Sequence, residues 1–192
     1  MRVLSAMLGF LFLGTVACSA PTTTGDTGAP AAPQASAAKP YASLVQLMRG
    51  IPFPSSNLIF DTQAKDPGAP PPKADKNAAG AGATATYASV YAGWELVEYA
   101  SLALAETANL IMIPGRVCSN GKPVPVDRDD FRKFAQGLVD AGMAAYKVAQ
   151  SKNLDAMVEV TGTVSDACAA CHEVYRDKGE AGSPERCAVP AP

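Results

Sequence analysis

Apolar residues recur at helical spacing in four stretches of the chain, and turn or loop residues separate each stretch from the next. Because positions three and four apart lie on one face of a helix, each stretch predicts an amphipathic helix with one buried side. The alternation of apolar and polar residues that marks a half-buried strand is nearly absent. The sequence therefore predicts an all-α fold, a four-helix up-down-up-down bundle.

Prolines set the bounds of the first two predicted helices. The first stops at Pro52-Phe53-Pro54 and resumes near Ser55 through Phe60, since proline disrupts a helix interior. The second runs from about Tyr87 to Ile113 and is closed by Pro114-Gly115. Their apolar stripes are Leu44, Leu47, Met48 and Ile51 in the first, and Trp94, Val97, Ser101, Leu104, Ala108 and Ile111 in the second.

The third predicted helix starts after Asp127, where two further acidic residues suit the positive end of a helix dipole. The fourth runs from about Leu154 to Tyr175. The expected buried positions are Phe131, Phe134, Leu138, Ala141 and Ala145 in the third, and Met157, Val160, Val164, Cys168 and Cys171 in the fourth.

Two other stretches lack the apolar bulk that a packed core requires. Residues 18–40 consist almost wholly of Ala, Pro, Thr, Gly and Ser, a composition typical of a flexible tether. Residues 65–86, which are rich in Pro, Ala and Gly, are expected to form a long surface loop between the first and second helices. The remaining length suits one domain over residues 41–180, followed by a short tail over 181–192.

The first 17 residues predict an export signal, with Arg2 before an apolar run that is too short to span a bilayer comfortably. The sequence Thr15-Val16-Ala17-Cys18 resembles a bacterial lipobox, although Thr15 stands where leucine is usual. We therefore expect lipidation of Cys18 and a location on the periplasmic side of a bacterial membrane. The alternative is a soluble periplasmic protein.

The formal net charge is −2, and the sequence shows no basic stripe. Proteins that bind nucleic acids neutralise phosphates with clustered lysine and arginine, so we expect no nucleic-acid partner.

The sequence Cys168-Ala-Ala-Cys171-His172 matches the Cys-x-x-Cys-His motif of covalent haem attachment, and His172 is the only histidine in the chain. Helical spacing places both thiols on one face, where they can form thioethers to the two vinyl groups while His172 turns toward the iron. The alternatives are a thioredoxin-like redox pair and half of a zinc site. No βαβ pattern surrounds the motif and no second cluster of ligands is present, which favours one covalent haem c.

A four-helix chain with Cys-Ala-Ala-Cys-His-Glu-Val-Tyr-Arg on its last helix resembles the class II c-type cytochromes, which comprise cytochrome c-prime and its methionine-ligated relatives. The resemblance covers about residues 41–178 and is specific only at 168–176; the Pro-rich insertion before the second helix departs from it. It implies that a methionine ligand, where present, comes from the first helix, which here offers Met48. It also implies that Arg176 lies close to the haem, with a propionate contact as one role, and that a homodimer can form.

Two functions remain open, and they differ in whether Met48 binds the haem iron. Pro52, four residues later, cannot donate to the Met48 carbonyl, and the resulting kink would let the thioether reach the iron. A His/Met-ligated haem indicates an electron carrier between periplasmic or membrane redox proteins. If Met48 is only a core residue, five-coordinate iron indicates a protein that binds NO or CO. We expect no enzymatic activity, because a peroxidase mechanism would lack its distal imidazole.

Cys118 and Cys187 remain once the other three cysteines are assigned. The second and fourth helices of the predicted bundle run in the same direction, so the segments that follow them emerge at one end and carry these two cysteines. In an oxidising compartment we expect them to form a disulfide.

Overall fold

The computed structural model describes residues 38–70, 82–83, 87–177, 179 and 187. Within these residues the fold is all-α, as predicted: five α-helices and two short 3-10 helices account for its regular structure, and the only β feature is an isolated bridge between Val117 and Pro123. Several predicted segments lie outside the described residues: the signal peptide, Cys18, nearly all of the tether, most of the 65–86 loop and the tail except Cys187.

The first helical segment consists of two helices, α1 (Leu44–Gly50) and α2 (Pro52–Phe60). A capping box starts α1: the Gln46 backbone N–H donates to Ser43 Oγ, and the Ser43 N–H donates to the Gln46 side chain at 2.9 Å. The chain breaks at Ile51 and becomes helical again at Pro52, so the expected resumption near Ser55 is wrong. Prolines fit the first turn because N–H groups there have no acceptor within the helix.

The second segment, α4 (Gly93–Ile111), starts later than the predicted Tyr87, and residues Ala88–Tyr91 form the 3-10 helix η2 instead. The cause is local: Ala92 is extended at φ −146°, and Gly93, the first residue of α4, has a φ of +72°, so the right-handed helix does not extend further back along the chain. From Trp94 to Ile111 the predicted stripe is buried at every position.

The third helix, α5 (Asp129–Ser151), starts where predicted, and the fourth, α6 (Leu154–Tyr175), has the predicted bounds. A tight turn joins them, with Lys152 in the left-handed region at φ 54° and the Asn153 side chain accepting from the Ala156 N–H at 3.0 Å. Their expected core positions are buried or half-buried, the latter being Phe134, Cys168 and Cys171.

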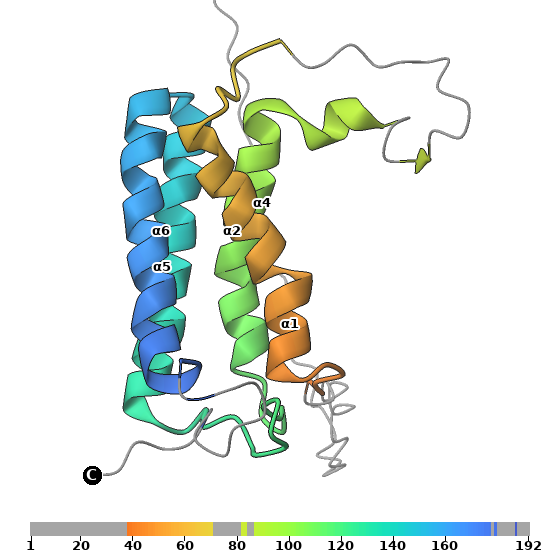
Figure 1. Cartoon of the computed structure of the whole chain (residues 1–192), viewed down its shortest axis with the longest axis vertical. Helices are drawn as coiled ribbons and strands as arrows, with labels where there is room; N and C mark the ends of the chain where they lie inside the picture. Colours follow the sequence, from red (N-terminus) through yellow and green to blue (C-terminus); the bar gives the residue numbers. More distant parts are fainter. Residues whose placement is uncertain (1–37, 71–81, 84–86, 178, 180–186, 188–192) are drawn as a thin grey trace, which may run out of the picture. The chain divides into compact units, whose positions relative to one another are not determined.

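Successive helical segments run in alternating directions, as the colour change along each helix shows in Figure 1. Helix α4 packs along α5, α5 along α6, and α2 along α4, whereas α2 and α6 touch only slightly. At one end of the α2–α6 side, the Gln63 amide from the 3-10 helix η1 (Asp61–Gln63) donates to the Thr161 hydroxyl at 2.7 Å. The weakly packed side between α2 and α6 leaves room for a cavity.

The close crossing of α4 and α5 depends on Gly142. A Cβ atom at this position would lie 2.8 Å from the Ala105 nitrogen and 2.9 Å from the Ser101 oxygen, both backbone atoms that move only with α4. We expect Gly142→Ala to lower the free energy of unfolding by about 1–3 kcal/mol, and urea denaturation measures this change. In the control Gly137→Ala, where a Cβ meets nothing within 4 Å, we expect a gain of about 0.5–1 kcal/mol. Equal effects of the two substitutions would show that the crossing is not tight.

Candidate functional site

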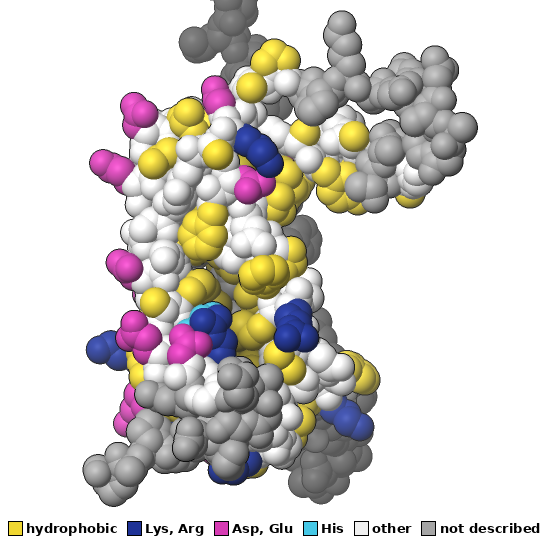
Figure 2. Space-filling model, viewed as in Figure 1, with side chains coloured by type: hydrophobic (Ala, Val, Ile, Leu, Met, Phe, Trp, Pro, Cys, Tyr) yellow, Lys and Arg dark blue, Asp and Glu magenta, His cyan; other side chains and the backbone are white. Residues whose placement is uncertain are grey.

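A cavity of about 670 Å³ lies between the α1–α2 segment and α6, with α5 contributing to one wall. This volume is within the range of about 300–1,000 Å³ that small-molecule and cofactor sites occupy. Figure 2 shows the only histidine at a hollow on this face, beside apolar and basic surface. The residues that line the cavity include Leu44, Met48, Pro52, Phe60, Phe134, Leu138, Cys168, Cys171 and His172.

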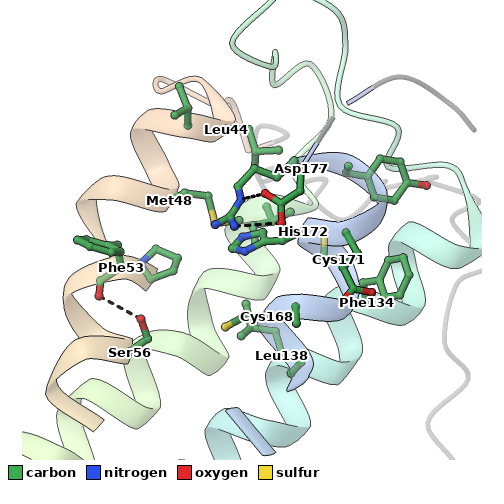
Figure 3. A pocket seen from close by; sticks show the side chains of 18 of the residues that line it. Leu44, Met48, Phe53, Ser56, Phe134, Leu138, Cys168, Cys171, His172 and Asp177 are labelled. Carbon is green, nitrogen blue, oxygen red and sulfur yellow. Dashed lines mark hydrogen bonds and ion pairs between the residues drawn. The ribbon is translucent and has the colours of Figure 1, made fainter. Parts of the chain in front are cut away.

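The three motif residues occupy the last two turns of α6 and line the cavity together. Cys168 and Cys171 are free thiols with intermediate exposure. Figure 3 shows the His172 ring projecting from α6 into the space between α6 and α1, with Cys168 one turn along the same helix. The donor set therefore fits a covalently held haem: two thiols and one imidazole lie on one helical face beside an apolar cavity of suitable size.

The electrostatics of the two thiols do not suit a redox dithiol. Burial raises the pKa of Cys171 to about 11, with a further increase from the neighbouring Cys168, and burial also raises the pKa of the Cys168 thiol. Reactive dithiols have lowered pKa values, which a helix N-terminus or adjacent cations provide. Here the pair lies at the opposite, C-terminal end of its helix, and burial outweighs the nearby Arg176 charge.

Burial, assisted by the charge of Arg176, lowers the pKa of His172. The imidazole is therefore neutral at neutral pH and keeps a lone pair that a metal can accept. Within the described residues, no group of three or more His, Cys, Asp or Glu side chains is placed to hold a metal ion.

Arg176 follows α6 and lines the cavity, but its guanidinium already pairs with Asp177, with Nε donating at 2.6 Å and Nη2 at 3.2 Å. Its side chain is half-exposed. Arg176 lines the same cavity as His172, and its closeness to the haem stays a prediction. The ion pair with Asp177 competes with the predicted propionate contact.

Met48 is half-buried on α1 and lines the cavity. In Figure 3 its side chain points from α1 toward His172 on the opposite wall. The other methionines among the described residues do not line this cavity: Met112 packs against the core, Met157 is fully buried within it, and Met143 is a half-buried residue of α5. The structure thus places Met48 on the wall of the cavity that faces His172.

Tyr175, the last residue of α6, anchors the end of the helix that carries the Cys-x-x-Cys-His motif. Its ring is buried edge-on against Phe131, with the ring centroids 5.1 Å apart. The Arg128 Nε donates to the Tyr175 hydroxyl at 3.0 Å and to Asp130 at 2.9 Å, which joins the last turn of α6 to the first turn of α5. These contacts fix the segment that carries His172.

The Arg128–Asp130 pair predicts a dependence of stability on pH. Hydrogen bonds from Arg128 lower the pKa of Asp130 to about 2. A carboxyl whose pKa is depressed by folding stabilises the fold above its unfolded pKa of about 4, and this stabilisation is lost as the pH falls toward the folded value. We expect urea denaturation between pH 5 and pH 2 to show a smaller loss of stability for Asp130→Asn than for the unsubstituted protein. Identical pH profiles would contradict this role.

Cys118 and Cys187 are joined by a disulfide, the pairing that the cysteine count predicts, with their Cα atoms 6.2 Å apart. Both side chains are buried and both line the cavity. We expect non-reducing tryptic mapping of the mature protein to recover a peptide pair joining Cys118 to Cys187. For a separation of 69 residues, reduction is expected to cost about 4 kcal/mol of stability on the chain-entropy model. Recovery of both cysteines as free, alkylatable thiols would refute this pairing.

Sequence reasoning missed Arg116, a loop residue between α4 and α5. Its exposure is only 4%, and burial lowers the pKa of its guanidinium. An arginine after a Pro-Gly turn gives no sequence signal of burial, because arginines are mostly exposed.

Comparison with models of protein families, with curated proteins and with solved structures finds no match for this chain. None of the described helices combines the length and apolar character needed to cross a membrane.

Proposed function

We propose that this chain is a mono-haem c-type cytochrome of the class II kind, a four-helix bundle that acts as a periplasmic electron carrier. The observation that carries the proposal is the convergence of Cys168, Cys171 and His172 on one wall of an apolar cavity, with Met48 on the opposite wall. Cys168 and Cys171 would hold the haem through thioethers, and His172 and Met48 would bind its iron.

A bound haem would supply one-electron redox chemistry. The protein's contribution is to hold and shield it. The neutral imidazole of His172 and the thioether of Met48 would keep the ligand set the same in both oxidation states, and methionine ligation raises the reduction potential. The apolar walls formed by Phe134, Leu138 and Phe60 would exclude water.

We propose a periplasmic setting because the sequence predicts an export signal and a lipid on Cys18. Partners would be periplasmic or membrane redox proteins, and a lipid on Cys18 would tether the domain to a membrane surface. We propose no nucleic-acid partner and no enzymatic activity.

The absorption spectrum of the reduced protein, produced together with a haem-attachment system, tests the proposal. We expect a low-spin spectrum that carbon monoxide changes little. A high-spin spectrum with ready CO binding would overturn electron transfer through a His/Met haem and would favour the alternative, a five-coordinate protein that binds NO or CO. Protein that contains no haem would overturn both functions.

A further inference from the structure

We infer that Arg116 and the Cys118–Cys187 disulfide are positioning groups that hold Met48 opposite His172, an inference that rests on the proposed function. The need for such groups follows from the cavity. Helix α1 packs against α2 and makes little direct contact with α6, because the cavity lies between α1 and α6. The separation of the two proposed ligands must therefore be set by connections at the edge of the cavity.

Arg116 fastens the start of α1 to the end of α4. Its Nη1 donates to the Ala42 carbonyl, just before the capping residue of α1, and its Nη2 donates to the Leu110 carbonyl at 2.8 Å in the last turn of α4. Carbonyls in the last turn of a helix carry partial negative charge and lack N–H donors from a following helical turn, so they suit a guanidinium. The Arg116 residue is only 4% exposed, so the two carbonyls replace part of the hydration that its charge loses on burial.

The next two residues extend this connection to α6. The Val117 carbonyl accepts from the Leu44 N–H, the first residue of α1, at 2.8 Å. Cys118 is disulfide-bonded to Cys187, whose N–H donates to the carbonyl of Tyr175, the last residue of α6, at 2.7 Å. A single run, 116–118, thus joins the beginning of α1 to the end of α6.

Both proposed ligands lie one helical turn from this connection. Met48 is four residues after Leu44, and His172 is three residues before Tyr175. A rigid helical turn transmits the position of its end to a side chain on the next turn. Loss of the connection would therefore increase the range of Met48–His172 separations and weaken methionine ligation without removing either ligand.

Arg116→Met, which keeps an unbranched apolar stem but removes the guanidinium donors, tests the inference in the haem-loaded protein. We expect a mixture of low-spin and high-spin haem and an apparent CO affinity that rises on the order of tenfold as the ligated fraction falls. Arg116→Lys should restore part of the low-spin signal, because one donor remains. Cys118→Ser combined with Cys187→Ser should shift the spectrum in the same direction as Arg116→Met.

Two controls separate positioning from general destabilisation. Arg132→Met removes an arginine that is half-exposed and pairs with the exposed Asp129, so it should leave ligation unchanged. Val97→Ala removes two buried methyl groups on α4 away from the cavity, so it should lower stability but keep the low-spin spectrum. If Val97→Ala changed the spectrum as much as Arg116→Met, the positioning role would be overturned.

Hydrogen exchange in haem-free protein gives a readout that does not depend on the cofactor. We expect Arg116→Met to speed exchange of the α1 amides while leaving those in the middle of α5 unchanged. Unchanged α1 exchange would overturn the inference whatever the haem content, whereas wild-type protein without covalent haem would overturn the proposed function. A wild-type protein with covalent but five-coordinate haem would leave attachment intact and overturn the positioning of Met48 as a ligand.

Discussion

Protein in which Cys168 and Cys171 are both replaced by alanine is expected to retain no haem after denaturation. The two thiols line the cavity beside His172, and each would add across one vinyl group to form a thioether. With both sulfurs removed, haem could bind only through axial ligands, which unfolding releases. Haem staining of denaturing gels after acid-acetone extraction measures the difference, and we expect complete loss in the double variant.

The other cysteine pair provides the matched control. Cys118→Ser combined with Cys187→Ser removes two sulfurs that also line the cavity but are joined to each other. This variant should keep its covalent haem stain even if its stability falls. Loss of covalent haem from the control, or its retention after both Cys168 and Cys171 are replaced, would contradict the assignment of the attachment residues.

Replacement of Met48 by alanine is expected to convert the haem from low-spin to high-spin and to open the iron to carbon monoxide. Met48 is the only methionine that lines the cavity within the described residues, so no other methionine there can replace it without a rearrangement of the helices. The change should therefore be nearly complete rather than partial. Absorption spectra of the reduced variant, before and after addition of CO, measure it.

Met112→Ala is the control for Met48→Ala. Met112 is a partly buried methionine that packs against the core after α4 and does not line the cavity. Its removal should cost stability but leave the spectrum low-spin. A low-spin Met48→Ala protein that still excludes CO would show that Met48 is not a ligand.

The helices that the sequence predicted well are those with strong periodicity and local end signals. The start of α5 and both ends of α6 lie where predicted, because acidic residues mark the first turn of α5 and the apolar spacing of α6 is regular. The start of α4 was missed because Gly93 takes a left-handed φ that the apolar pattern does not encode. Pro52 begins α2 rather than only ending α1, since the same residue is compatible with both roles.

The residues of the candidate site differ in the same way: local sequence determines the positions of some, and tertiary contacts determine the importance of others. Cys168, Cys171 and His172 were recognisable because helical spacing alone brings them together. Arg116 and Gly142 could not be recognised, because their importance depends on which backbone atoms of other segments lie next to them. The position of Met48 across from His172 likewise depends on the fold, although its helix was predicted.

Peptide mapping of the mature, denatured wild-type protein tests the central claim most directly. The account predicts that one haem is covalently bound to the tryptic peptide that contains Cys168, Cys171 and His172, and that alkylation of this peptide finds no free thiol. Recovery of the same peptide without haem and with two alkylated cysteines, from cells that attach haem to other cytochromes, would contradict it.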